Sequence, residues 1–99
     1  MRILAVVASI VVASLTVLRA PGYGYSLLET LSAAGFEAEA NTLYPLLRRL
    51  EAQGLLTSEW REEGGRKKRF YRLSPDGRQI LKQLLAEWNG INQSLDRIV

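Results

Sequence analysis

The fold is decided by residues 41–53, whose sequence is NTLYPLLRRLEAQ. Its leucines recur at the helical spacing i, i+3, i+4, i+7, and they are Leu43, Leu46, Leu47 and Leu50. This spacing predicts an amphipathic helix that starts at Asn41, a favourable N-cap residue, and ends before Gly54. At about 100° per residue, the opposite face carries Asn41, Pro45, Arg48 and Ala52, flanked by Tyr44 and Arg49. A helix that buries leucines and presents this face to solvent can lie in a groove.

A β-hairpin is predicted directly downstream. Residues 55–61 and 67–73 are short β-prone runs, and residues 62–66, EEGGR, join them. The two glycines supply the backbone angles that a hairpin turn needs. Consecutive cations lie at its tip and at the start of its second strand: Arg66, Lys67, Lys68 and Arg69. The acidic pair in the same turn, Glu62 and Glu63, is interpreted as a solvated tip that partly compensates these charges.

Helices are also predicted on both sides of this region. Residues 24–34 carry leucines at helical spacing after a break at residues 20–22, Ala-Pro-Gly. The last helix begins with a cap residue, a proline and an acid, which are Ser74, Pro75 and Asp76. Its apolar residues recur at a spacing close to a heptad: Ile80, Leu84, Trp88, Ile91, Leu95 and Ile98. A body this small cannot cover so long a helix, so we expect the apolar seam to meet a second copy of the chain.

The composition limits the classes of function. The chain has 99 residues, about the length of one domain, and contains no His and no Cys. These absences exclude imidazole bases, thiolate nucleophiles, disulfides and zinc sites of the usual Cys/His kind. The net charge is +3, and the excess positive charge lies in residues 41–73. A polyanion-binding surface requires such a region, although a solvated basic loop would have the same composition.

Residues 3–18 are apolar, with no charge between Arg2 and Arg19. The segment is shorter than the ~20 residues of a membrane-spanning helix. It matches the core of a signal peptide behind a short basic start. Without cysteines, however, nothing downstream resembles a disulfide-stapled secreted domain. We therefore expect a buried first helix, with a membrane anchor or a signal as the alternative.

The predicted order of three helices, a hairpin and a long last helix describes a winged helix-turn-helix, which is a mainly α fold with a small β-hairpin. The expected elements are helices at 3–19, 24–34 and 41–53 and a wing at 55–73, together a DNA-binding domain over 1–73, followed by a dimerisation helix over 74–99. In this fold the third helix enters the major groove of DNA, and the wing holds the neighbouring backbone.

Candidate DNA contacts follow from the chemistry of the side chains. Asn41, Thr42 and Arg48 can donate hydrogen bonds to base edges near the start of the recognition helix. Tyr44 can donate to a phosphate or pack on a sugar, and Pro45 lies on the same outward face. The four wing cations suit phosphates, which require positive charge without strict geometry.

Three stretches carry a resemblance to a known family: GYGYSLLETL at 22–31, NTLYPLLRRLEAQGLLTSEW at 41–60 and GGRKKRFYRLSPDGR at 64–78. Over about residues 20–90 the chain resembles the PadR family of bacterial winged-helix repressors, and residues 42–51 are the specific signal. The resemblance implies a cytoplasmic homodimer that binds a palindromic operator, represses nearby genes and releases the DNA when a small molecule binds. The end at Val99 is similar to the short subgroup, whereas the uncharged first helix departs from the family pattern.

The resemblance also implies roles for particular residues. By matched position, the DNA contacts would be Thr42, Tyr44, Arg48 and Arg49, with residues 66–69 in the wing. In the family the last helix forms the dimer interface with help from the first. Trp88 falls where some members line a pocket for a small hydrophobic or aromatic effector, whereas packing in the core or the interface is the simpler role for it. No cofactor and no metal is implied.

Two other classes of function stay open at this point. One is a small membrane-anchored or secreted protein that uses residues 3–18 as its anchor or signal. The other is a winged helix that binds an acidic protein partner instead of nucleic acid. An enzyme is the least favoured class, because no hydroxyl has a base to activate it and no phosphate-binding loop or carboxylate metal cluster can be assembled.

Overall fold

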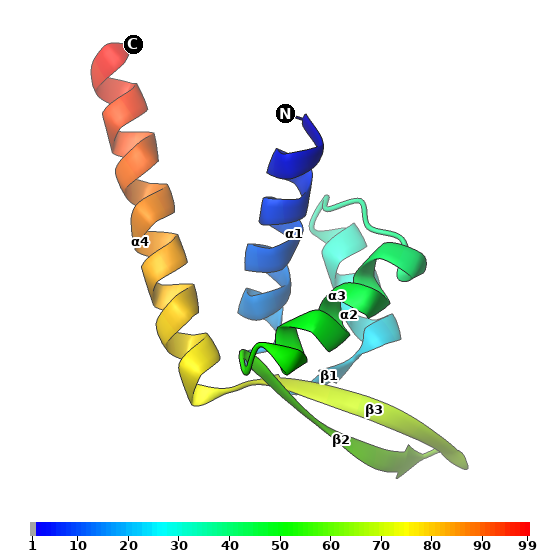
Figure 1. The fold of residues 1–99 in the computed structure, drawn as a ribbon. Coiled ribbons are helices and arrows are strands. Elements are labelled where there is room, and N and C mark those ends of the chain that lie inside the picture. Colours follow the sequence, from blue (N-terminus) through cyan, green and yellow to red (C-terminus); the bar gives the residue numbers. More distant parts are fainter. Residues whose placement is uncertain (1) are drawn as a thin grey trace.

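Four helices and three strands are present in a computed structural model of the chain, which describes the backbone of residues 2–99 and the side chains of residues 9–99 (Figure 1). In chain order they are α1 (Arg2–Val17), β1 (Gly22–Tyr23), α2 (Gly24–Ala33), α3 (Ala40–Ala52), β2 (Leu56–Glu63), β3 (Arg66–Leu73) and α4 (Pro75–Ile98). This mainly α architecture with a small antiparallel sheet confirms the predicted fold class, a winged helix with a long last helix.

The start of α3 differs from the prediction. The helix begins at Ala40, with Glu39 as its N-cap residue. The prediction that Asn41 caps it is therefore wrong, and Asn41 lies exposed on the first turn. Ala38 packs against the core just before the cap, while Glu39 makes no side-chain cap hydrogen bond. Tertiary packing thus outweighs capping preference in setting where this helix begins.

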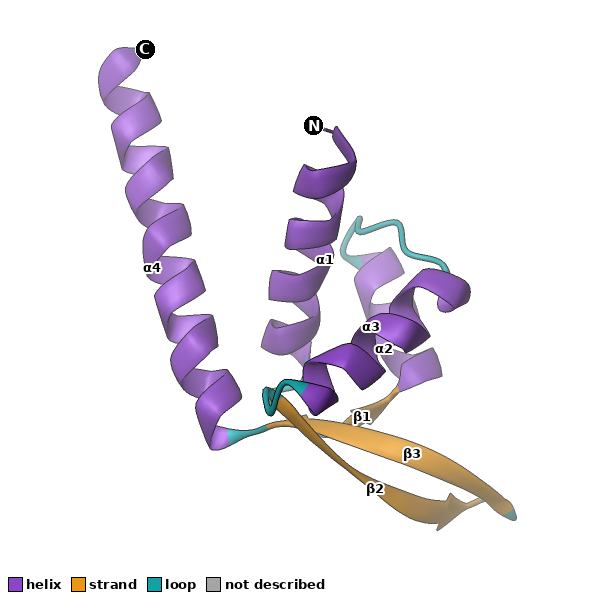
Figure 2. Ribbon diagram, in the orientation of Figure 1, coloured by secondary structure: helices purple, strands orange, loops and turns teal. Residues whose placement is uncertain are grey.

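The sequence did not predict β1, a strand of two residues. It pairs with β3, so that β3 lies in the middle of a three-stranded antiparallel sheet of order β1-β3-β2 (Figure 2). Tyr23 lies opposite Phe70 in this pairing, and the two rings meet edge to face with their centroids 5.4 Å apart. The contact ties the start of α2 to the wing, the hairpin of β2 and β3.

The core lies where the helices meet the base of the wing. Its buried members are Ile10, Leu15, Leu18, Leu27, Leu31, Leu43, Leu47, Leu50, Leu56, Tyr71, Leu73 and Leu81. On α3 the predicted leucine stripe is confirmed, with only Leu46 half-buried. Ile10 and Leu15 show that α1 packs in the core; the predicted burial of residues 3–8 lies outside the described side chains. None of the described helices is long and apolar enough to cross a membrane.

The start of α4 packs tightly against the base of the wing. Ser74 Oγ accepts a hydrogen bond from the Gly77 amide at 2.9 Å, as expected of a cap, and donates one to the Gly54 carbonyl at 2.6 Å. A Cβ on Gly77 would collide with the Leu55 carbonyl oxygen, so only glycine permits this close approach. The first turn of α4 is therefore held firmly at the end of β3.

Beyond its first turns, α4 extends away from the core alongside α1 (Figure 1). Leu81 is buried and Leu84 is half-buried, but the apolar side chains from residue 85 onward are exposed: Leu85, Trp88, Ile91, Leu95 and Ile98. The molecule is accordingly elongated, with principal extents of 55 × 27 × 20 Å. The far half of α4 therefore presents an apolar face that is largely exposed.

Candidate nucleic-acid interface

The outward face of α3 carries the predicted recognition residues. Because Leu43, Leu47 and Leu50 are buried in the core, the side chains on the other face are exposed. These are Asn41, Thr42, Tyr44, Pro45, Arg48 and Arg49. Pro45 has no N–H to donate to the Asn41 carbonyl one turn earlier, so that carbonyl can accept a hydrogen bond from another molecule. All six predicted contacts of this helix are thus accessible to a ligand.

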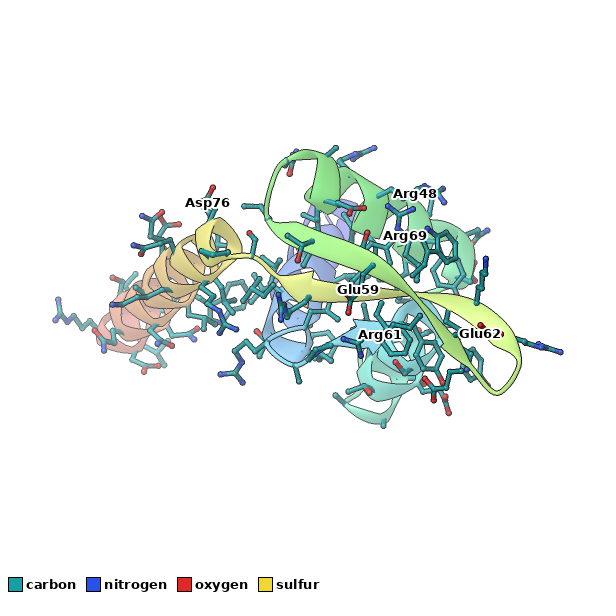
Figure 3. All side chains as sticks on the ribbon, turned by 90° about the horizontal axis from the view of Figure 1, so that it is seen from below. Arg48, Glu59, Arg61, Glu62, Arg69 and Asp76 are labelled. Carbon is teal, nitrogen blue, oxygen red and sulfur yellow. The ribbon has the colours of Figure 1, made fainter. Side chains whose placement is uncertain are left out.

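A groove of about 830 Å³ runs between α3 and the wing. Cations line both sides of it: Arg48 on α3, and Arg66, Lys67, Lys68 and Arg69 on β3. Aromatic rings lie between them: Tyr23, Tyr25, Tyr44, Trp60 and Tyr71. Figure 3 shows Arg48 and Arg69 on the same side of the wing, toward α3. Positive charge beside flat apolar rings suits a sugar-phosphate backbone.

The start of α2 forms a further wall of this groove. The Tyr23 N–H donates to the Ser26 hydroxyl at 3.2 Å, and this hydroxyl donates back to the Tyr23 carbonyl at 2.8 Å. A Cβ on Gly24 would lie 2.5 Å from Cε1 of Tyr44, so the absence of a side chain lets the tyrosine ring lie against this helix end. Amides at a helix N-terminus carry partial positive charge, which favours a phosphate here.

The wing cations have different surroundings. Arg66 and Lys67 are exposed and face acidic residues across the hairpin. Neither makes an ion pair within the part of the chain that the structure describes. Lys68 is half-buried, with Nζ 4.3 Å from the centroid of the Tyr23 ring. Arg66 and Lys67 are therefore the wing cations most available to a phosphate.

Arg69, by contrast, is already engaged within the protein. Its Nη2 forms an ion pair with Glu51 at 3.0 Å, and its Nε donates to the Ser58 hydroxyl at 2.9 Å. The sequence analysis assigned all four wing cations to phosphates, because they are consecutive in the sequence. Lys67 and Arg69 lie on the same face of β3, but Arg69 is nearer the base of the wing, where Glu51 of α3 is within reach, whereas Lys67 is close to the turn.

Besides the buried Tyr71, three aromatic residues of the groove were missed in the sequence. Tyr23 and Tyr25 belong to the GYGY run, and Trp60 is 64% exposed on β2. Alternation along β2 places Trp60 on the same face of the wing as Ser58, which contacts α3. A tryptophan in a polar strand beside cations was an available signal, but its face could be assigned only with the strand register.

The predicted dimer residues divide along α4. Ile80 and Leu84 are half-buried, whereas Trp88, Ile91, Leu95 and Ile98 are exposed. Trp88 is 53% exposed, so it does not pack in the core of its own protomer. It borders an apolar hollow of about 390 Å³ whose other walls come from α1, α2 and the loop residue Phe36.

A model of the transcriptional regulator PadR-like family matches residues 14–83, which include α2, α3 and the wing. The chain belongs to the PadR-like family. The resemblance carried by the recognition helix and the wing is thereby confirmed.

Solved structures of transcriptional regulators share this architecture. A PadR family transcriptional regulator from Eggerthella lenta DSM 2243 is 39% identical, with a TM-score of 0.89 over 99% of this chain and 88% of that chain. A Streptococcus transcriptional regulator is 25% identical, with a TM-score of 0.86 over 99% of this chain and 97% of that chain. This coverage includes α4, so the long last helix is part of the shared fold.

A relative from Mycobacterium tuberculosis, transcriptional regulator Rv3488, is 48% identical over 61 residues. These residues make up 62% of this chain and 57% of that protein, so the match extends over little more than half of the relative.

Proposed function

We propose that this PadR-like protein is a homodimeric transcriptional regulator that binds a palindromic operator on double-stranded DNA and represses the genes beside it. The observation that carries the proposal is the exposed face of α3 beside a groove lined by cations from α3 and the wing. A winged helix uses this arrangement to engage base edges and phosphates at the same time. Membership of a family of transcriptional regulators supports the same function.

The proposed contacts divide into base contacts and backbone contacts. Asn41, Thr42 and Arg48 carry the donors that recognise base edges in the major groove. Tyr44 and Arg49 flank this face and would bind the DNA backbone, as would the exposed wing cations beside them. Residues 1–73 would together form the DNA-binding domain.

Residues 74–99 would supply the dimer contact. An apolar seam exposed from Trp88 to Ile98 is unfavourable in water, and a second copy related by a twofold axis would cover it. The two recognition helices would then meet half-sites about 34 Å apart, one turn of DNA. An operator with twofold symmetry follows from the symmetry of such a dimer.

The apolar hollow beside Trp88 suits an effector. A small hydrophobic or aromatic molecule would bury its surface against Trp88, Phe36 and Leu85. Because the walls come from α1, α2 and α4, a ligand there would contact the DNA-binding domain and the dimerisation helix together. A ligand that favours one arrangement of these two parts over another would lower the affinity for DNA.

This role would place the protein in the cytoplasm with its DNA target, and it involves no enzymatic reaction. The family to which the chain belongs consists of transcriptional regulators, which are not enzymes.

The test is fluorescence-anisotropy binding of the purified protein to its own upstream intergenic DNA and to a scrambled duplex, across a series of salt concentrations. We expect tighter binding to the upstream DNA, and this preference should persist as the salt concentration rises. Equal and steeply salt-dependent binding to both duplexes would mean that the wing merely attracts a polyanion. A winged helix that binds an acidic protein would then be the better account.

A further inference from the structure

Three polar side chains link the end of α3 to both strands of the wing. Glu51 lies in the last turn of α3, Ser58 on β2 and Arg69 on β3. Arg69 Nη2 lies 3.0 Å from Glu51 Oε1, and Arg69 Nε donates to Ser58 Oγ at 2.9 Å. The Ser58 hydroxyl donates in turn to Oε2 of Glu51. Each of the three side chains therefore bonds to the other two.

The geometry of this ring of bonds restricts how the wing can tilt. A guanidinium is planar, and its N–H donors point in fixed directions. The guanidinium of Arg69 also lies over two aromatic rings, 5.5 Å from the centroid of Trp60 and 5.9 Å from that of Tyr71. A tilt of the wing away from α3 would have to break the bonds to Glu51 or pull α3 along.

The ring of bonds lies where the wing leaves the body of the protein. Leu56 and Leu73 at the base of the wing are buried, whereas residues 59–67 are exposed. Ser58 and Arg69 lie between these two parts, with the base on one side and the exposed tip on the other. Contacts at this position can therefore set the direction in which the tip extends.

We propose that Glu51, Ser58 and Arg69 form a clamp that sets the angle between the wing and α3, and that Arg69 is a positioning residue rather than a phosphate contact. The inference rests on the proposed function, because the angle fixes how far Arg48 on α3 lies from Lys67 on the wing when both meet DNA. With the clamp closed, one DNA site engages both residues together. When the clamp is open, the wing tip samples other directions. Once Arg48 is bound to DNA, Lys67 is then less often in position to bind as well, so its effective concentration falls.

The clamp and a simple charge effect predict opposite results for Glu51→Gln. If Glu51 merely lowered the positive potential of the groove, removing its charge would strengthen DNA binding. If it holds the wing, the same substitution weakens binding to the upstream DNA by about tenfold, within the range of such coupling effects. Glu62→Gln is the matched control, because it removes the same charge near the hairpin turn without touching the clamp. Stronger binding by both variants would overturn the proposal.

Arg69→Gln and Lys67→Gln form a second matched pair on β3. Lys67→Gln should weaken binding to all duplexes alike and reduce the salt slope by about one. Arg69→Gln should weaken binding to the upstream DNA more than to the scrambled duplex and leave the salt slope unchanged. An equal reduction of the slope by both substitutions would identify Arg69 as a phosphate contact and overturn the clamp.

A distance measurement without DNA separates the clamp from the proposed function. The chain has no Cys, so Ser32→Cys on α2 and Glu63→Cys at the wing tip give two unique spin-label sites. In doubly labelled chains diluted with unlabelled protein, we expect a narrow distance distribution. Glu51→Gln and Ser58→Ala should broaden it, and Glu62→Gln should not. Unchanged widths in both clamp variants would overturn the inference, whatever the DNA measurements give.

The spin-label distance distinguishes a failure of the clamp from a failure of the proposed function. A broadened distribution supports the clamp even if the protein shows no preference for its upstream DNA, in which case the proposed function fails by itself. Thermal unfolding of each variant identifies any that lose the fold. If Arg69→Gln does not fold, Glu51→Gln and Ser58→Ala carry the test.

Discussion

Two helices of this protein, α3 and α4, carry similar apolar stripes in different surroundings. On α3, Leu47 is 1% exposed, and Leu43 and Leu50 of the same stripe are buried with it. On α4, Leu95 is 52% exposed and Ile98 is 81% exposed. Helical periodicity therefore predicts that a face is to be buried, without indicating which surface buries it. For α3 that surface belongs to the same chain, whereas for α4 the proposed function requires a second one.

The largest effect on stability is expected from a substitution in the buried stripe of α3. Leu47→Ala should lower the free energy of unfolding by about 2–5 kcal/mol, because it leaves a cavity where neighbours cannot fully relax. Urea denaturation followed by circular dichroism measures the change. Leu95→Ala, at low protein concentration, is the control on the exposed stripe and should cost much less. If both variants lost the same free energy of unfolding, the stripes of α3 and α4 would be buried to the same extent, contrary to this comparison.

A charge placed in the exposed apolar stripe of α4 should disrupt the proposed dimer. Ile91→Glu should raise the dissociation constant of the dimer by about 100-fold or more, since a carboxylate would be buried at the seam. The fold of each protomer should persist, because Ile91 is exposed within it. Sedimentation velocity measures the association, with Gln93→Glu on the other face of α4 as the control. If Ile91→Glu still forms dimers, the interface lies elsewhere.

The outward faces of the two helices also differ, since only that of α3 borders the groove. Arg48→Ala should weaken binding to the upstream DNA by about 1–3 kcal/mol and reduce the preference over scrambled DNA. Lys67→Ala should weaken binding to both duplexes about equally. Anisotropy titrations of the two variants in parallel decide the matter. Retention of full sequence preference by Arg48→Ala would remove this side chain from the base contacts.

The smallest effect concerns α1, which lies between α4 on one side and α2 and α3 on the other (Figure 1). The Ser14 hydroxyl is buried and has no hydrogen-bond partner among the described residues. Ser14→Ala should therefore raise the free energy of unfolding by about 1 kcal/mol, because it removes an unsatisfied polar group. Thr16→Ala is the control, since the Thr16 hydroxyl donates to the Val12 carbonyl at 2.7 Å and no gain is expected. A lower Tm for Ser14→Ala would contradict this account.

The features that the sequence predicted well depend on neighbours close along the chain. The stripe of α3 and its exposed face follow from one helical period, and the cap at Ser74 follows from three consecutive residues. The hairpin turn follows from Gly64 and Gly65, both of which have positive φ. Each of these features needs only a local rule, so one sequence suffices.

The features that the sequence did not predict depend on residues far apart in the chain. Two residues are too few to show a strand period, so β1 became visible only through its pairing with β3. Arg69 meets Glu51 across a separation of 18 residues, which no spacing rule anticipates. The position of Tyr44 against α2 similarly depends on the missing side chain of Gly24. Helix α3 and its exposed face could thus be predicted from the sequence pattern, but the different surroundings of the four wing cations could not.

The junction at Ser74 has a mechanical consequence. β3 ends at Leu73 and α4 begins at Pro75, so the one residue between them is Ser74, which is buried and bonded to Gly54 and Gly77. A hinge requires residues whose backbone is free to rotate, and the single residue of this junction is held by both hydrogen bonds. The base of the wing and the first turn of α4 are therefore fixed to the same part of the core, so the direction in which α4 leaves the core is set together with the position of the wing base.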